Sequence, residues 1–291
     1  MPRTLLAVHA HPDDESSKGA GTLARYADEK VRTVVVTCTG GEAGEILNPA
    51  MDQPGNLERM PELRRQELAK ALEILRVGAH YWLGYRDSGM PDTDSNAHPG
   101  AFANASLVEA TGRLVRIIRE ERPQVLLTYD ERGGYPHPDH IRTHEVSVAA
   151  FEAAGDPDRY PDAGSPFQPL KLYYHASFTR QRLQAIHAAA VARGIDSPFG
   201  EWLQRWDPDE HPEPVVTTQV DVSRYLAQRR DALIAHATQI DPNGFWFAVP
   251  ENVIADIYPW EDYTLVRSRV PAPRPEHDLF AGIAEDGQPS R

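Results

Sequence analysis

Strand-like segments alternate with segments of helical spacing through the first half of this 291-residue chain, and that alternation limits the fold more than any other feature. The strand-like segments lie at 4–9, 31–39, 80–83 and 125–129, and the helical segments between them at 17–29, 59–75 and 107–118. Helices between successive strands favour parallel pairing of those strands. The sequence therefore predicts an α/β fold with a Rossmann-like, mostly parallel sheet flanked by helices.

The second half of the chain is less regular. Residues 155–169 are rich in Pro, Asp and Gly, which predicts a loop between two parts of the chain. Beyond this loop we expect strands over 170–178 and 215–220 and a helix over 225–237. The expected parts are a Rossmann-like core over 1–155, a C-terminal α/β part over 156–270 that covers the core, and a Pro-rich tail over 271–291, packed on the surface or partly loose.

Charge and composition exclude several classes of partner. The chain has 30 Lys and Arg residues against 43 Asp and Glu, a net charge of −13, and no cluster of basic residues. Because such a chain repels phosphates, neither nucleic acid nor an anionic membrane is expected as a partner. The single cysteine, Cys38, lies in an apolar run, which argues against a thiol nucleophile. We found no pattern of a signal peptide or membrane span, so we expect a cytoplasmic protein; whether it forms a homo-oligomer stays open.

Metal-binding side chains gather at two points where predicted strands end. The run AHPDDE at 10–15 follows the first strand, and GGYPHPDH at 133–140 follows the strand over 125–129. Open α/β sheets bind ligands at the carboxyl ends of their strands, so the two clusters converge if these strands are neighbours. His11, Asp14 and His140 would then hold a metal ion and leave one position open for water, as a hydrolytic zinc site requires. Asp13 would remain free as a base, and the core would be the metal-binding, catalytic part.

Each cluster also has a structural interpretation. Asp13, Asp14 and Glu15 could simply mark the start of a helix, where carboxylates interact well with the helix dipole. His144 lies one helical turn after His140 and is a rival ligand, since a His pair at that spacing is a known zinc arrangement. The coincidence of both clusters at two strand ends favours a metal site over separate capping roles.

Two motifs resemble the signatures of a known family. The runs HPDDE at 11–15 and PHPDHI at 136–141 are similar to those of the LmbE-like superfamily of zinc-dependent N-acetylglucosaminyl deacetylases and amidases. The resemblance extends from Leu6 to about Ile283 and is strongest to the amidase branch that acts on mycothiol S-conjugates. Runs similar to that branch are SSKGA at 16–20, GEILNP at 44–49, DSG at 87–89 and HATQIDP at 236–242.

The resemblance implies a metal ion and a base. It assigns Zn²⁺, or Fe²⁺ in its place, to His11, Asp14 and His140, the same residues that the spacing selects. Such an ion lowers the pKa of bound water and polarises the amide carbonyl. Asp13 matches the general base of the family, which removes a proton from the water and returns it to the departing amine.

Three further residues match roles around the reacting carbonyl. His137 matches the residue that stabilises the oxyanion, as an imidazolium, and Asp139 would hold its ring in place. Tyr135 matches a mobile tyrosine that joins this task. Ordinary turn packing after Gly133 and Gly134 is the alternative for Tyr135.

Three residues match substrate-binding positions. Arg64 and Asp87 match positions that hydrogen-bond the hydroxyls of glucosamine, although Arg64 could instead be a solvated helix charge. Lys18 lies where the amidase branch carries lysine, one helical turn after Asp14, and is expected to reach over the pocket mouth to a larger substrate. Solvation of a helix surface is the alternative for Lys18.

The reaction implied by the resemblance is hydrolysis of the amide in a small-molecule thiol conjugate of glucosaminyl-inositol. The products would be glucosaminyl-inositol and a mercapturic acid, formed in detoxification or in the trimming of a thiol-tagged biosynthetic intermediate. The residues over 156–270 would complete the substrate pocket. The nearest alternative is deacetylation of N-acetylglucosaminyl-inositol. One remote alternative is a non-haem iron oxygenase, but the ligands of those enzymes usually form His-x-Asp on a β-barrel. Another is a nucleotide-binding module, but residues 19–21 are not placed as a phosphate-binding loop.

Overall fold

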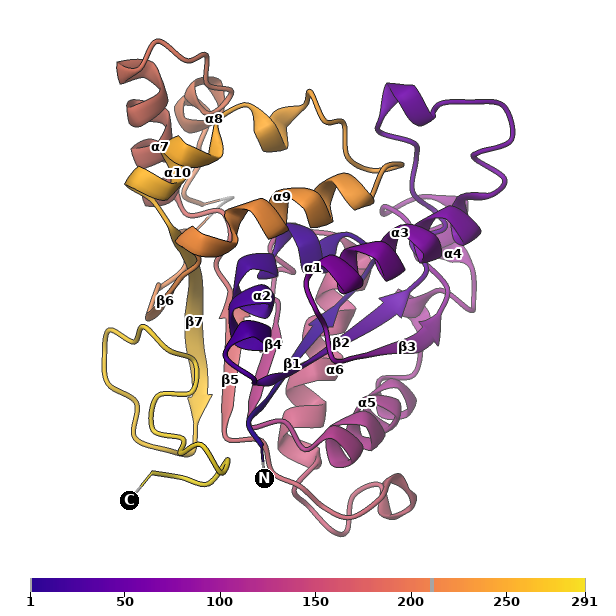
Figure 1. Ribbon diagram of the computed structural model, residues 1–291. Helices are drawn as coiled ribbons and strands as arrows, with labels where there is room; N and C mark the ends of the chain where they lie inside the picture. The colour runs from indigo at the N-terminus through magenta and orange to yellow at the C-terminus, as the bar shows by residue number, and fades with distance from the viewer. Residues whose placement is uncertain (1, 210–211, 291) are drawn as a thin grey trace.

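Seven strands form one sheet in the computed structural model, which describes residues 2–209 and 212–290. Their order is β3-β2-β1-β4-β5-β7-β6. All neighbours from β3 to β5 pair in parallel, whereas β7 runs antiparallel to both β5 and β6. Helices cover both faces of the sheet (Figure 1). The predicted Rossmann-like, mostly parallel α/β fold is therefore confirmed.

Strands and helices alternate through the first half of the chain as expected. The elements are β1 (Thr4–His9), α1 (Asp14–Ser17), α2 (Ala20–Asp28), β2 (Arg32–Thr39), η1 (Pro49–Met51), α3 (Met60–Ile74), β3 (Ala79–Tyr85), α4 (Asp94–Ala97), η2 (Phe102–Asn104), α5 (Leu107–Glu121) and β4 (Val125–Thr128). The helix expected over 17–29 is broken at Gly19, where the chain turns between α1 and α2. Gly19 has a φ of +89°, and a Cβ there would lie 3.0 Å from Cε1 of His175, so glycine is what permits this turn.

The second half completes the sheet and adds helices at one end of it. The elements are α6 (Pro138–Ala153), η3 (Pro161–Ala163), β5 (Lys171–His175), α7 (Arg180–Ala192), α8 (Phe199–Gln204), β6 (Thr218–Asp221), η4 (Ser223–Tyr225), α9 (Leu226–Ala235), η5 (Phe245–Phe247), α10 (Glu251–Ile257) and β7 (Trp260–Ser268). The sequence pattern did not predict β7. Its second and third residues are the buried carboxylates Glu261 and Asp262, which hide the alternation typical of a strand.

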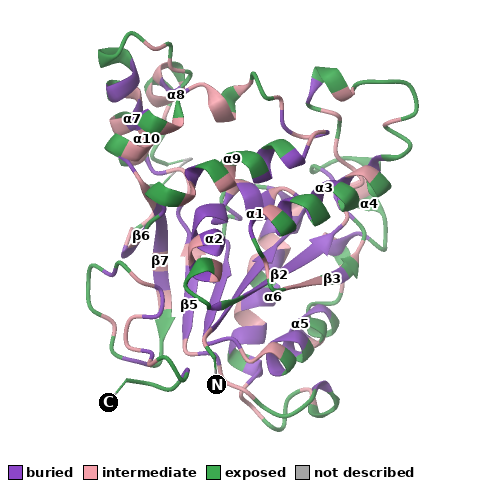
Figure 2. Cartoon of the chain, in the orientation of Figure 1, coloured by how far each residue is buried: buried purple, intermediate pink, exposed green. Residues whose placement is uncertain are grey.

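Alternate side chains of each central strand enter two separate hydrophobic clusters. On β1, Leu5 and Ala7 join the cluster packed under α2, α3 and α9, while Leu6 and Val8 join the cluster packed under α5 and α6. All four side chains are fully buried. Figure 2 shows the central strands buried between the two layers of helices. The carboxyl ends of the parallel strands therefore remain as the place where loops can form a binding site.

A third hydrophobic cluster lies outside the sheet. It is formed where α7, α8 and α10 pack together, at the upper left of Figure 1. These helices stand near the carboxyl end of β5 and the start of β7, so they cover the same edge of the sheet as the loops of the parallel strands. No helix in residues 2–209 or 212–290 is long and apolar enough to cross a lipid bilayer.

The C-terminal tail packs on the body of the protein. Its side chains Leu279 and Phe280 are buried in the cluster under α2, α3 and α9. Glu276 is also buried, and its carboxylate accepts hydrogen bonds from Nζ of Lys171 at 2.5 Å and from the hydroxyl of Tyr173 at 2.9 Å. Apolar contacts and a buried ion pair thus hold residues 276–280 in place.

Candidate metal centre and active site

The two polar clusters expected from the sequence meet at the carboxyl edge of the sheet, because β1 and β4 are neighbours. His11 and Asp14 follow β1, and His140 lies in the first turn of α6 after β4. One ligand atom from each of these residues lies within 4.8 Å of the others. Nε2 of His140 is 3.4 Å and Nδ1 of His11 is 3.7 Å from Oδ2 of Asp14. Two imidazole nitrogens therefore face one carboxylate oxygen at separations that suit a shared cation.

His140 presents an unpaired nitrogen at this point. Its Nδ1 lies 2.9 Å from the main-chain oxygen of Gly133, so Nδ1 carries the proton and Nε2 keeps its lone pair. A Cβ at Gly133 would lie 2.5 Å from Cβ of His140, so this close approach requires glycine. Nε2 is buried and has no hydrogen-bond partner among the described residues, and burial holds the pKa of His140 well below its usual value. A buried, neutral imidazole with a free nitrogen beside a carboxylate fits a divalent metal ion.

Asp14 is held in place by three donors. Its Oδ2 accepts hydrogen bonds from the main-chain N–H of His11 at 3.0 Å and the hydroxyl of Tyr129 at 2.8 Å. Its Oδ1 accepts from Nζ of Lys18 at 2.7 Å. Burial opposes ionisation of Asp14, but charged neighbours, the Lys18 ammonium among them, outweigh burial and hold its pKa well below the usual value. The carboxylate is therefore ionised and oriented, as a metal ligand must be.

The carboxylate of Asp139 contacts His11, and not His137 as expected from the sequence. Nε2 of His11 lies 3.2 Å from Oδ2 of Asp139 and 3.6 Å from Oδ1 of Asp87. Burial alone would lower the pKa of His11, but these carboxylates raise it to about 10. They fix a proton on Nε2, so that Nδ1 is the atom available towards Asp14, and a metal ion there would replace the second proton. Asp139 lies at the start of α6, which faces the loop after β1, so its carboxylate reaches His11.

His11, His137 and Asp139 form a second group whose ligand atoms lie within 4.8 Å of one another. In this group the Asp139 carboxylate already accepts hydrogen bonds from His11 and from both the main-chain N–H and the hydroxyl of Ser88. Nδ1 of His137 also accepts a hydrogen bond, from the main-chain N–H of Asp139 at 3.1 Å. The second group is therefore saturated by protein donors, whereas the first group retains the free nitrogen of His140.

His137 caps the N-terminus of α6, and this cap bears on its protonation. Because Nδ1 of His137 accepts a hydrogen bond from the main-chain N–H of Asp139, this atom carries no proton. Burial, and then the charge of His11, also lower the pKa of His137. The structure thus favours a neutral ring with a proton on Nε2 over the imidazolium expected from the sequence.

Tyr135 stands at the solvent side of the centre. Its side chain is 46% exposed, and its ring centroid lies 4.6 Å from that of His140 and 6.0 Å from that of His137. The residue follows Gly133 and Gly134, both with positive φ, in the loop between β4 and α6. Tyr135 therefore packs in a turn and also borders the space in front of both histidines.

Asp13 lies directly beside the candidate metal ligands. Its φ of +108° places a non-glycine residue in the left-handed region, a strained conformation of the kind found at functional sites. Its Oδ2 accepts a hydrogen bond from Nη2 of Arg64 at 3.1 Å. Burial raises the pKa of the Asp13 carboxyl, and the guanidinium of Arg64 opposes that shift.

Arg64 is buried, so it is not a solvated helix charge. Only 3% of the residue is exposed. Nη1 donates to the main-chain oxygen of Gly41 at 2.7 Å, and Nη2 donates to the main-chain oxygen of Pro12 as well as to Asp13. The guanidinium thus ties the loop after β1 to the loop after β2, and most of its donors are used inside the protein.

Asp87 and Lys18 are buried at the same edge of the sheet. Asp87 accepts hydrogen bonds from the main-chain N–H groups of Ala43 and Gly89, at 3.1 and 2.8 Å. Lys18 donates to Asp14 and, at 3.2 Å, to the hydroxyl of Ser17. Because Lys18 is only 8% exposed, the solvated alternative is wrong, and its ammonium acts on a metal-ligand candidate instead of reaching over the pocket mouth.

The rival ligand His144 points elsewhere. Its Nδ1 lies 3.0 Å from the main-chain oxygen of Tyr129, and its ring packs edge-on against Tyr174 at 5.2 Å. His144 is absent from both groups of clustered ligand atoms found among the described residues. One helical turn after His140 therefore does not bring it to the same point.

The sequence analysis assigned no role in the site to Tyr129, Ser88 or His236, and it considered Glu15 only as part of a helix start. Nε2 of His236 lies 2.7 Å from Oε1 of the buried Glu15, and Oε2 of Glu15 accepts from the main-chain N–H of Asp13 at 3.0 Å. This pair supports the strained loop from a segment 221 residues away in the chain. The only sequence signal for His236 was the run HATQIDP at 236–242.

Comparisons with known proteins agree with this geometry. Residues 6–151 match the PIG-L family, described as GlcNAc-PI de-N-acetylase. A mycothiol S-conjugate amidase of Streptomyces coelicolor is 50% identical over 97% of this chain and 98% of its own length. The chain belongs to the PIG-L family. A 1D-myo-inositol 2-acetamido-2-deoxy-alpha-D-glucopyranoside deacetylase of Streptomyces avermitilis is 42% identical over 97% of this chain and 98% of its own length.

A similar fold is also seen in a solved structure. The N,N'-diacetylchitobiose deacetylase of Pyrococcus horikoshii covers 91% of this chain with 84% of its own, at a TM-score of 0.61 and 17% identity. That likeness shows the shared fold. The PIG-L match contains all three residues of the candidate metal centre, and the two similar full-length sequences also span the helices that stand over it.

Proposed function

We propose that this PIG-L family enzyme hydrolyses the amide of mycothiol S-conjugates to release glucosaminyl-inositol and a mercapturic acid. The observation that carries the proposal is the convergence of His11, Asp14 and His140 beside Asp13, in a chain 50% identical to a mycothiol S-conjugate amidase. Both kinds of relative are named as hydrolases of an amide, and this chain is an enzyme of that class. The relative that is 42% identical makes N-acetylglucosaminyl-inositol the alternative substrate.

Zn²⁺ is the metal ion that we propose for this centre. Two imidazole nitrogens and one carboxylate oxygen are a donor set that zinc prefers, and Fe²⁺ accepts the same donors. When bound, the ion polarises the amide carbonyl and lowers the pKa of a water molecule. The unpaired Nε2 of His140 and the oriented carboxylate of Asp14 support this assignment.

Asp13 is proposed as the group that moves the proton. Its carboxylate takes a proton from the attacking water and delivers it to the amide nitrogen as the C–N bond breaks. Arg64 contacts Oδ2 of Asp13, which leaves Oδ1 for the proton and holds the side chain beside Asp14. Arg64 thus acts as a positioning residue for the base.

His137 and Tyr135 are proposed to stabilise the charge that develops on the carbonyl oxygen. With Nδ1 of His137 engaged as a helix cap, its Nε2–H is the donor that remains for an oxyanion. Tyr135 lies over the same face, so its hydroxyl can add a second donor. A neutral donor of this kind needs no change of protonation during turnover.

Asp87 is proposed to bind the amino-sugar. It follows β3, and together with the loop after β2 it lies on one side of the metal centre. The acyl part of the substrate would then extend towards β5. We place the reaction in the cytoplasm, in line with a single buried cysteine and no disulfide, and we propose no nucleic-acid or membrane partner.

The test compares substrates on protein of known metal content. The purified chain is stripped with a chelator, reloaded with Zn²⁺ or Fe²⁺, and assayed on the S-benzyl conjugate of mycothiol and on N-acetylglucosaminyl-inositol. We expect one ion per chain and a higher kcat/KM for the conjugate. A higher kcat/KM for N-acetylglucosaminyl-inositol would favour the deacetylase, and full activity in metal-free protein would overturn the mechanism.

A further inference from the structure

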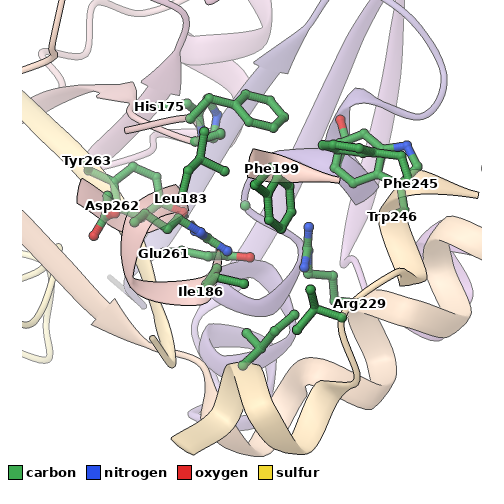
Figure 3. A pocket seen from close by; sticks show the side chains of 17 residues that line it. His175, Leu183, Ile186, Phe199, Arg229, Phe245, Trp246, Glu261, Asp262 and Tyr263 are labelled. Atoms are coloured by element: carbon green, nitrogen blue, oxygen red, sulfur yellow. Dashed lines mark hydrogen bonds between the residues drawn. The ribbon is translucent and has the colours of Figure 1, made fainter. Parts of the chain in front are cut away.

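A cavity lies at the edge of the sheet, under the helices of the third hydrophobic cluster. It contains about 730 Å³ of empty space, part of it open to solvent. Its wall is largely apolar and aromatic (Figure 3), with side chains from α7, α8 and η5: Leu183, Ile186, Phe199, Phe245 and Trp246. A cavity of this size and lining is typical of a small-molecule binding site.

The floor of this cavity adjoins the candidate metal centre. It is formed by Ser17, Gly19 and His175. The hydroxyl of Ser17 accepts a hydrogen bond from Lys18 at 3.2 Å, and the same ammonium donates to Asp14 at 2.7 Å. A single side chain, Lys18, thus connects a residue of the cavity floor to a candidate metal ligand.

The cavity and the proposed sugar site lie on opposite sides of the metal centre. Asp87 follows β3, and the candidate metal ligands follow β1 and β4, whereas His175 ends β5 and Glu261 is the second residue of β7. The order β3-β2-β1-β4-β5-β7 therefore places the metal centre between the two. If the amide lies over the metal centre with its sugar towards Asp87, its acyl part is directed to the cavity.

The two carboxylates that line the cavity are already engaged by the protein. Glu261 accepts hydrogen bonds from the main-chain N–H groups of Gly21 and Thr22, at 3.0 and 2.8 Å. Asp262 accepts from the hydroxyl of Tyr258 at 2.9 Å and from the side chain of Gln219 at 3.0 Å. These acids therefore act as structural acceptors; the charge of Glu261 also acts on Arg229, where it opposes the lowering of the Arg229 pKa by burial, but the two form no ion pair.

Arg229 is a cation of the cavity wall, and its guanidinium lies over the ring of Trp246, 5.9 Å from the ring centroid. It lies on α9, half-buried, and it forms no hydrogen bond or ion pair with another described residue. Figure 3 shows its side chain directed into the cavity beside Phe199. Burial, and then the charge of Arg182, lower the pKa of Arg229 to about 10, so it still carries its charge at neutral pH. A guanidinium that rests on an aromatic ring and has no hydrogen-bonded partner suits a planar anion such as a carboxylate.

We propose that this cavity binds the S-substituent of the conjugate and that Arg229 selects aromatic substituents bearing a carboxylate. The inference rests on the proposed function, because it requires that an acyl group larger than acetyl reach the cavity. Its apolar wall buries the aromatic ring, and the guanidinium binds the acid at the far end. Arg229 is thus assigned as a specificity-determining residue that contacts the substrate remote from the reacting amide.

The test uses two conjugates of mycothiol that differ in one group, S-benzyl and S-(4-carboxybenzyl). In the wild-type protein we expect a higher kcat/KM for the carboxybenzyl conjugate. Arg229→Met should lower the ratio of the two kcat/KM values by about ten-fold or more, since a charged hydrogen bond is typically worth about 1.5–3 kcal/mol. Arg229→Lys should retain part of the ratio.

The matched control is Arg230→Met. Arg230 is the next residue along the chain, is exposed, and is paired with Asp231 and Glu251. The ratio of the two kcat/KM values should be the same in this variant as in the wild type. A fall in both variants would indicate a general effect of charge and would overturn the assignment of Arg229.

A binding measurement on the wild-type protein guards against a poorly folded variant. Calorimetry compares N-acetyl-S-(4-carboxybenzyl)cysteine with the methyl ester of its benzoate, and we expect tighter binding of the acid. Equal binding, or an unchanged kcat/KM ratio in Arg229→Met, would overturn this inference alone if both conjugates are hydrolysed. Failure to hydrolyse either conjugate while N-acetylglucosaminyl-inositol is deacetylated would overturn the proposed function as well.

Discussion

The contact between Asp139 and His11 yields a prediction that separates two roles for Asp139. In Asp139→Asn the negative charge beside Nε2 of His11 is removed, although the amide oxygen can still accept from Ser88. Losing the charged acceptor of a ligating imidazole should weaken metal binding by about 10–100-fold. The same figure follows from about 1.5–3 kcal/mol for a charged hydrogen bond, at about 1.4 kcal/mol per factor of ten.

The assay is competition for Zn²⁺ between the stripped protein and a coloured chelator, which measures metal affinity without reference to turnover. Ser88→Ala is the matched control, because it removes a donor to the same carboxylate but leaves the charge facing His11. Its effect on metal affinity should be smaller than that of Asp139→Asn. Thermal unfolding of the metal-free variants shows whether loss of the buried Asp139 carboxylate affects the fold.

One result would refute this reasoning. If Asp139→Asn bound Zn²⁺ as tightly as the wild type but lost turnover, Asp139 would act on the reacting carbonyl through His137, as the sequence alone suggested. If affinity and turnover both fell and saturating Zn²⁺ restored turnover, the role of Asp139 in orienting His11 would be supported.

Three other variants test neighbouring parts of the structure. Asp13→Ala should keep its metal ion, as measured by elemental analysis, and its kcat should fall by about 10²–10⁴-fold, because the proposed base is removed. A variant that is folded but free of metal would show that Asp13 is a ligand. Lys18→Met should lower kcat/KM by about ten-fold or more on both the conjugate and N-acetylglucosaminyl-inositol, because the Lys18 ammonium donates a hydrogen bond to Asp14 and both reactions depend on Asp14. A loss on the conjugate alone would instead support a role of Lys18 in specificity. Glu276→Gln leaves the buried Lys171 without its charged partner and should lower the free energy of unfolding by about 3–5 kcal/mol in urea titrations, with metal content unchanged. An unchanged unfolding midpoint would show that this ion pair adds no stability.

The parallel half of the fold and the candidate metal triad could be predicted from the sequence. Apolar runs and helical spacing are local properties, so they located β1, β2 and β4 with small errors at their ends. The position of His11, Asp14 and His140 after two such strands then followed from the general rule that strand ends converge. That rule applies only if β1 and β4 are neighbours, a condition that the sequence left open and that the structure meets.

The tertiary structure decided which atoms of these residues meet and which segments complete the site. The carboxylate of Asp139 reaches His11 across 128 positions of the chain, and His236 reaches Glu15 across 221. The antiparallel β7 and the place of Arg229 in the cavity wall also depend on segments that are distant in sequence. Local periodicity carries no information about such pairs, because side-chain direction and burial are set only when the helices of the second half pack over the sheet.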